Sequence, residues 1–179
     1  MTWLNSDGLF VKFGKEEGVS AKGGGVSTCD DRAQVISFTV TWDQLTASTQ
    51  ILGATSVDQS GSIGVVLPKG MYIEEIEIIA EQAFTSSGSI GASTFVLGLI
   101  RSDRSTELDY DGLTTASFVG SLINANGEKN VVRSGSTGAG ALIGTTLANN
   151  GYITVANSAH AAHPYTAGKL VVRVRGYTP

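Results

Sequence analysis

The sequence predicts an all-β protein, an antiparallel β-sandwich or jelly roll with an N-terminal arm. Three observations predict it: short segments of alternating apolar and polar residues, turns rich in Gly, Asn and Pro, and little helical periodicity. Gly, Ser, Thr, Val and Ile dominate the 179-residue chain. β-Branched side chains fit a pleated sheet, and Gly supplies the positive-φ positions of turns. A chain of this length suits one domain, or one domain with an arm.

Residues 1–31 are predicted to be an N-terminal arm, or a first strand, followed by a Gly-rich hinge, and residues 32–179 to be the sandwich domain. Three consecutive glycines at 23–25 leave the backbone unusually free, which is typical of a hinge. In the arm interpretation, a sister subunit or another partner protein buries the large apolar residues before the hinge; in the strand interpretation, their own domain does. These candidate interface residues are Leu9, Phe10, Val11 and Phe13.

The strands of the domain are predicted from period-two alternation, which gives a strand one buried face. The clearest covers residues 35–42, with one face made of Ile36, Phe38, Val40 and Trp42. Residues 61–81 contain two more, separated by a turn at 68–70 in which Pro68 fits the second position and Gly70 the positive-φ position. Others are predicted within residues 93–101, 152–156 and 168–177, whereas 114–123 fits either a short helix or a strand.

Charged residues on two of these strands alternate with apolar ones. Glu75 and Glu77 project from the face opposite an apolar row, and Arg173 and Arg175 do the same on the last strand. If the two strands are neighbours, these residues form cross-strand ion pairs worth roughly 0.2–1 kcal/mol each. The alternative is four separately solvated charges.

Composition argues against several classes of protein. The net charge is −4, and Lys and Arg are scattered rather than clustered, so no nucleic-acid partner is expected. Cys29 is the single cysteine, which excludes an internal disulfide and a Cys-based zinc site. No apolar run approaches the roughly 18 residues of a membrane span. The first ten residues lack the features of a signal peptide, so synthesis in the cytoplasm without export is expected.

Two segments attract attention as possible ligand sites. The glycine-rich stretch 135–144 lacks the Lys-Ser/Thr pair of a P-loop and the strand–turn–helix setting of a dinucleotide fingerprint, so we interpret it as a surface loop. His160 and His163 are the two histidines. Pro164 disfavours a helix at His163, and no third ligand accompanies the pair, so we interpret both as loop residues beside a turn.

The acidic loop at 103–112 contains Asp103, Glu107, Asp109 and Asp111. We interpret these carboxylates as solvated, with a weak cation site as the alternative, because the EF-hand order of ligands is absent. A paired-carboxylate glycosidase would need these acids to converge with Glu75 and Glu77 and would need more aromatics for sugar stacking. No Gly-x-Ser-x-Gly elbow supports a nucleophilic serine. The sequence therefore predicts no enzyme, no catalytic or metal site, no cofactor and no small-molecule substrate.

Passages from the start, middle and end of the chain together point to a family. They are NSDGLFVKFGKEEG (5–18), VLPKGMYIEEIEI (66–78), and GLIRSDRSTELDYDG (98–112) followed by GALIGTTLANNGYITV (140–155). In this order they resemble a family of small structural proteins encoded beside the major capsid protein in tailed bacteriophages. The resemblance implies a virion location and a head decoration (cement) protein that binds the outer surface of the capsid lattice and stabilises it.

The implied partner is the major capsid protein, and local threefold symmetry of the lattice predicts a homotrimer. A subunit repeated many times gains avidity from modest contacts, which fits this interpretation. Two alternatives stay open: a tail or neck β-sandwich protein of the same virion, and a carbohydrate-binding module. The module would require an exposed aromatic platform, and the aromatics of the sequence are widely spread: Trp3, Trp42, Tyr110, Tyr152 and Tyr165.

Overall fold

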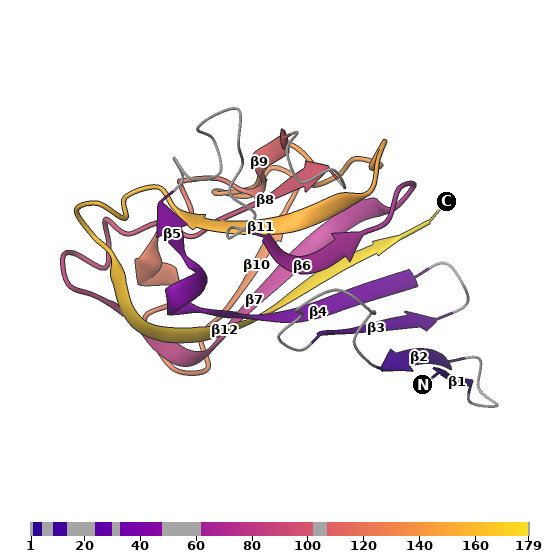
Figure 1. The fold of residues 1–179 in the computed structure, drawn as a ribbon, viewed down its shortest axis with the longest axis horizontal. Coiled ribbons are helices and arrows are strands. Elements are labelled where there is room, and N and C mark those ends of the chain that lie inside the picture. Colours follow the sequence, from indigo (N-terminus) through magenta and orange to yellow (C-terminus); the bar gives the residue numbers. More distant parts are fainter. Residues whose placement is uncertain are drawn as a thin grey trace.

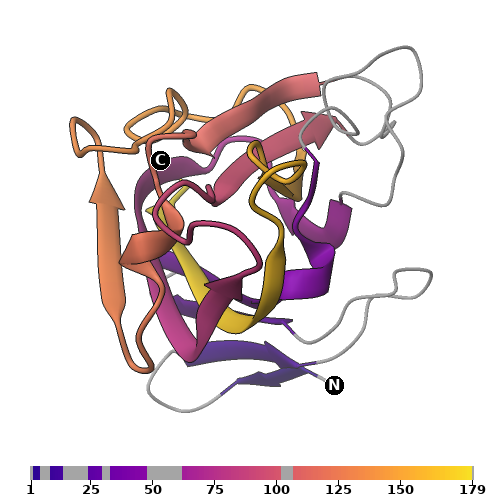
Figure 2. The ribbon, with the colours of Figure 1, turned by 90° about the vertical axis from the view of Figure 1, so that its left-hand side faces the viewer.

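The protein is an all-β sandwich of two sheets, seen as two layers of strands in Figures 1 and 2. The computed structural model describes residues 2–4, 9–13, 24–29, 33–47, 62–101 and 107–178, and the side chains of 34–45, 65–100 and 109–178. In these ranges the helical elements are two single 3-10 turns, η1 (Trp42–Gln44) and η3 (Gly120–Leu122). The predicted antiparallel sandwich is confirmed, and the jelly-roll connectivity stays a prediction.

The larger sheet contains seven strands, and every neighbouring pair in it is antiparallel. Its order is β1 (Thr2–Leu4), β2 (Leu9–Phe13), β3 (Gly24–Cys29), β4 (Ala33–Thr41), β12 (Tyr165–Tyr177), β7 (Tyr72–Ser86) and β10 (Lys129–Arg133). The long strands β12 and β7 form its centre. Strand β10 forms one edge of the sheet, and the hairpin of β1 and β2 lies at the other edge (Figure 1).

The smaller sheet contains β5 (Thr46–Ala47), β11 (Gly151–Asn157), β8 (Val96–Arg101) and β9 (Glu107–Thr114), in that order. Strand β6 (Ser62–Leu67) also pairs with β11. The short contact of β5 with β11 is parallel, and the other pairings are antiparallel. Residues 114–123, which fitted either a helix or a strand, are β9's last residue, a turn and η3.

One hydrophobic core lies between the sheets. The predicted inward rows are confirmed: Ile36, Phe38 and Val40 on β4 are at most 4% exposed, and Leu170, Val172 and Val174 on β12 are fully buried. Trp42 is a correction, because its side chain is 43% exposed instead of continuing the β4 row. The strand ends at Thr41, where a capping box with Gln44 starts η1 and turns the chain out of the sheet.

Three strands of the segment 1–31, which precedes the predicted sandwich domain, belong to the larger sheet. Residues 9–13 form β2, which pairs with β1 and β3, and two of the three consecutive glycines lie in β3 opposite Phe38 and Ser37 of β4. Residues 14–23 lie outside the described residues, as do the side chains of the candidate interface residues Leu9, Phe10, Val11 and Phe13. The interface and the division at residue 31 therefore stay predictions.

The predicted turn between β6 and β7 is present with a shifted position. Gly70 has φ +86°, and the N–H of Met71 donates to the carbonyl of Pro68 at 3.2 Å. Pro68 therefore occupies the first position of the turn instead of the second, and Gly70 is the positive-φ residue at the third, as in a type II turn.

Candidate functional site

The outward-facing side of β10, β7 and β12 carries most of the chain's described charge. We call this surface the outer face. Its residues alternate along each strand with buried ones, because successive side chains of a strand point to opposite sides of the sheet. The outer face consists of Lys129, Val131 and Arg133 on β10, Glu74, Glu75, Glu77, Ile79 and Glu81 on β7, and Lys169, Val171, Arg173, Arg175 and Tyr177 on β12. Glu74 and Glu75 both face outward, because the register of β12 with β7 shifts between Arg175 and Gly176.

Glu77 lies at the centre of the outer face and is 2% exposed. Lys129 contacts one carboxylate oxygen from β10, and Arg173 Nη1 donates to the other from β12 at 2.9 Å. Arg175 Nη2 approaches the same oxygen at 3.8 Å. The hydrogen bond from Lys129 is the main cause that holds the pKa of Glu77 below its ordinary value, with Arg173 adding to it against the opposing effect of burial.

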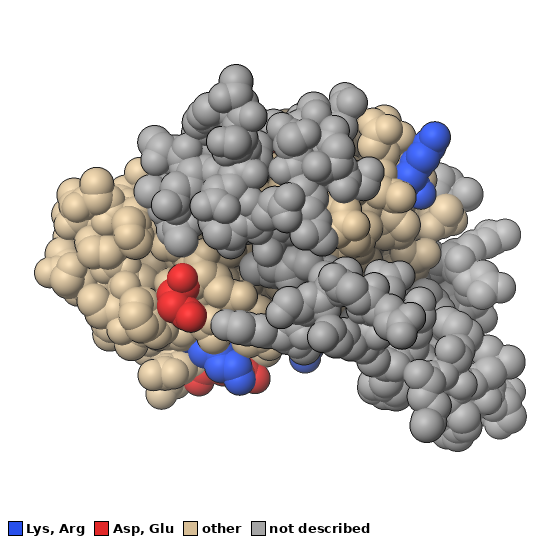
Figure 3. Space-filling view, in the orientation of Figure 1, with Lys and Arg blue, Asp and Glu red and all other residues tan. Residues whose placement is uncertain are grey.

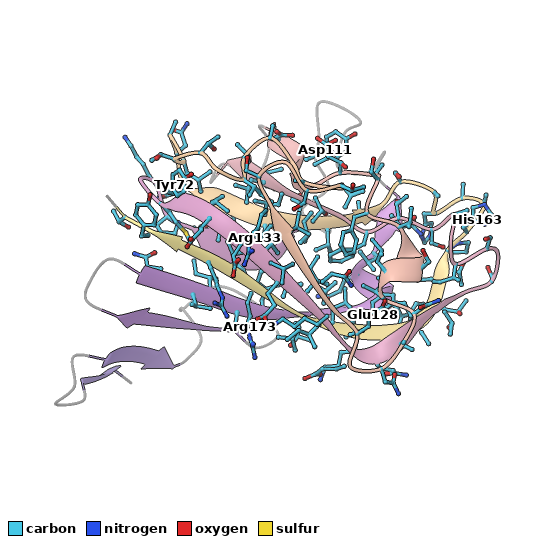
Figure 4. The ribbon with its side chains drawn as sticks, turned by 180° about the vertical axis from the view of Figure 1, so that it is seen from behind. Tyr72, Asp111, Glu128, Arg133, His163 and Arg173 are labelled. Atoms are coloured by element: carbon cyan, nitrogen blue, oxygen red, sulfur yellow. The ribbon has the colours of Figure 1, made fainter. Side chains whose placement is uncertain are left out.

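Glu75 forms a second node of the same network. Arg133 Nε donates to Oε2 at 2.7 Å, and Arg175 Nε lies 3.5 Å from Oε1. Further along, Lys169 and Glu81 form an exposed pair at 2.6 Å. The carboxylates of this network lie on β7, and the cationic side chains lie on β10 and β12, so opposite charges face each other across both strand pairs. Figure 4 labels Arg133 and Arg173, which belong to the network.

The cross-strand pairs predicted from the sequence are confirmed, and the alternative of four separately solvated charges is wrong. In the register of β12 with β7, Arg173 lies directly opposite Glu77 and Arg175 directly opposite Glu75. Strand β10 also places Arg133 opposite Glu75. Sequence reasoning did not assign Lys129 and Arg133 to the network, since only the strand order brings β10 beside β7.

The outer face is cationic although the chain is acidic. It holds five cationic and four carboxylate side chains, a net charge of +1, whereas the whole chain carries −4. In the view of Figure 3, blue and red side chains lie beside one another near the lower edge of the described surface. Exposed large hydrophobic residues of the described chain also belong to the larger sheet or its ends: Val131, Tyr177 and Trp42, at 39%, 39% and 43%.

The histidines lie in the turn after β11, and their interpretation as loop residues is confirmed. His163 Nδ1 accepts a hydrogen bond from the Ser89 N–H at 3.0 Å. Its ring packs so closely on Gly88 that a Cβ there would lie 2.4 Å from Nδ1. No group of three His, Cys, Asp or Glu side chains suited to a metal ion occurs within the described residues. His163 thus joins two loops at one end of the sandwich.

Replacing His163 by alanine is expected to lower the free energy of unfolding by about 1 kcal/mol, the typical value of one lost hydrogen bond. The loop at 87–93 should loosen, because the Ser89 N–H loses its acceptor. Hydrogen exchange of the Ser89 amide should accelerate while amides in the core strands keep their protection. An unchanged Ser89 exchange rate would show that this contact does not hold the loop.

The acidic loop at 103–112 and the glycine-rich stretch 135–144 meet on the smaller sheet. Residues 107–112 belong to β9, and Asp103 lies outside the described residues. Asp111 lines an open cleft of about 490 Å³ together with the loop residues Thr115, Ser134, Gly135, Ser136, Ala139, Gly140, Ala141 and Ile143. Glu75 and Glu77 lie on the other sheet and pair with arginines, so they do not converge with Asp109 and Asp111, the loop acids whose side chains are described, as a glycosidase would need.

Comparisons with known proteins add a likeness in fold. No family model matches the chain, and no curated protein matches it. The structure is similar to a chain of the cyanophage Pam1 capsid asymmetric unit, with a TM-score of 0.45 and 16% sequence identity, over 90% of this chain and 93% of that one. Among the described residues, no helix is long and apolar enough to cross a membrane.

Proposed function

We propose that the protein is a non-enzymatic structural protein of a tailed-bacteriophage virion, specifically a head decoration (cement) protein on the outer surface of the capsid lattice. The observation that carries the proposal is the outer face, an ordered and charged sheet surface that no other described segment covers. Such a surface suits binding by contact area and charge. The family resemblance of the passages at 5–18, 66–78, 98–112 and 140–155 supplies the setting.

A rigid body supports this role. One continuous core joins both sheets, and the ion network ties β10, β7 and β12 together on the outside. A subunit that is repeated over a lattice gains avidity from every contact it repeats, provided that its binding surface keeps one shape. The edge strand β10 begins with Lys129 and ends with Arg133, and charges at such positions discourage edge-to-edge aggregation.

The finer proposal is a homotrimer whose partner is the major capsid protein. In it, Leu9, Phe10, Val11 and Phe13 contact a sister subunit or the capsid, since burying each such side chain stabilises an assembly by roughly 1.5–3 kcal/mol. Strand β2 lies near the free edge of the larger sheet, where a neighbouring subunit has access to it. No nucleic acid, membrane or small-molecule partner belongs to the proposal.

A carbohydrate-binding module is less well supported. Trp42 follows Thr41, which pairs with Lys169, whereas Tyr177 lies at the other end of β12. Eight residues of strand separate Lys169 from Tyr177, a span of roughly 26 Å at about 3.3 Å per residue. The two exposed aromatics are therefore too far apart to stack on neighbouring sugar rings of one short glycan.

Co-sedimentation with purified, undecorated capsids of the encoding phage tests the function. We expect binding that saturates at a fixed number of copies per capsid, and light scattering that gives the mass of three chains in solution or on the particle. Protein that stays in the supernatant at every concentration would refute the proposal. Selective binding on a glycan array without capsid binding would favour the module instead.

A further inference from the structure

We propose that the outer face is the docking surface of the protein and that it binds an acidic protein surface. The structure supplies the surface and the sign of its charge. The identity of the partner as the capsid rests on the proposed function.

The first argument is charge segregation. Six cationic residues have described side chains, and five of them lie on the outer face; Lys69 is the other. The face keeps a net charge of +1 after all four of its carboxylates are counted, on a chain of net charge −4. Their exposed fractions, between 42% and 67%, leave donor groups available to a partner. Complementary potentials steer association and select acidic partner surfaces.

The second argument is residue type. Protein interfaces are enriched in Trp, Tyr and Arg, and their hot spots combine such anchors with exposed apolar side chains. The outer face carries three arginines, and Val131 stands exposed between Lys129 and Arg133. Tyr177 stacks on Tyr72 with ring centroids 4.9 Å apart, so its ring is held in place before any partner arrives. Preorganised side chains lose less entropy on binding.

The third argument is that two other partners, nucleic acid and a second copy of the chain, fit the outer face less well. Nucleic acid is disfavoured, because Glu75, Glu77 and Glu81 would face its phosphates and already occupy several cationic donors. A second copy that paired through β10 is also disfavoured. Antiparallel pairing centred on Val131 would place Lys129 opposite Arg133 of the other copy, and like charges directly opposite each other destabilise a sheet. An acidic protein surface meets neither obstacle.

The test compares three variants of the full chain. Val131→Glu and Lys169→Glu place negative charge on the outer face, and Lys69→Glu makes the same change from lysine outside it. Thermal unfolding first establishes that each variant keeps the wild-type Tm to within a few degrees. We expect the Kd for capsids to rise about tenfold or more for Val131→Glu and Lys169→Glu, and to stay within about twofold for Lys69→Glu.

Two further probes separate this inference from the proposed function. Poly-L-glutamate should bind the wild type with an affinity that falls as salt rises, and both face variants should lose that binding. If capsids fail to bind but poly-L-glutamate behaves in this way, the proposed function fails and the inference stands. If face variants bind capsids as Lys69→Glu does, or if the wild type ignores poly-L-glutamate, the inference is overturned. Tighter binding of double-stranded DNA than of poly-L-glutamate would also overturn it.

Discussion

Replacing Gly98 by alanine is expected to destabilise the protein by about 3 kcal/mol or more, at the upper end of the range for overpacked sites. Gly98 lies in β8, where the backbone of β9 approaches closely. A Cβ at this position would lie 1.9 Å from the carbonyl oxygen of Tyr110 and 2.0 Å from its carbonyl carbon. Backbone atoms cannot rotate away as a side-chain end does, so the two strands would have to separate. Their register is already irregular between Leu97 and Leu99.

Gly91→Ala is the matched control, because the nearest atom to an added Cβ there is Ser89 Oγ at 3.9 Å. Its free energy of unfolding should stay within about 0.5 kcal/mol of the wild type. Urea unfolding followed by fluorescence measures both variants, with the shift of the midpoint at unchanged slope giving the difference in stability. Equal midpoints for the two variants would mean that β9 does not pass so close to Gly98.

The strands and their inward rows could be predicted from the sequence because alternation is a local property. Ile36, Phe38 and Val40 follow one another at period two, and the same rule gives the buried row of β12. The rule fails at Trp42, where the pattern continues in the sequence but the strand does not. The Thr41–Gln44 capping box ends the strand there, and a cap overrides apolar spacing.

What the sequence could not provide is the order of the strands. Strand β7 lies between β12 and β10, which are far from each other along the chain, and alternation carries no information about such pairings. The sequence therefore predicts that Glu77 faces outward, but it does not predict that Lys129 and Arg173 enclose its carboxylate. For the same reason the sequence does not show that Gly98 is special, because the close approach of the Tyr110 backbone depends on the pairing of β8 with β9. The composition of the candidate site was thus partly predictable, whereas its assembly was not.

Replacing Glu77 by glutamine is expected to lower the free energy of unfolding at pH 7 by about 1–2 kcal/mol. Charged hydrogen bonds from Lys129 and Arg173 are lost at a side chain that is 2% exposed. The effect stays below that of a fully buried ion pair, because Lys129 and Arg173 are 54% and 42% exposed and water solvates them once the carboxylate is gone.

The same carboxylate gives the stability a definite pH dependence. Folding lowers the pKa of Glu77 from its ordinary value of 4.5, so the unfolded chain binds this proton more readily than the folded one. The stabilisation is therefore fully present above that ordinary pKa and is lost as the pH falls through the lowered pKa of the folded state. Glu77→Gln cannot make this proton exchange, and its stability should fall less steeply in the acid range.

Glu81→Gln is the control for this prediction, since Glu81 and its partner Lys169 are both 45% exposed. Exposed pairs contribute little, so this variant should keep the wild-type stability at pH 7 to within about 0.5 kcal/mol and retain the wild-type acid dependence. Urea unfolding of the three proteins at several pH values between about 3 and 7 measures both quantities. Identical stability of Glu77→Gln and Glu81→Gln at every pH would contradict the prediction, because it would mean that the ion pairs of β10, β7 and β12 follow from the strand register and do not stabilise it.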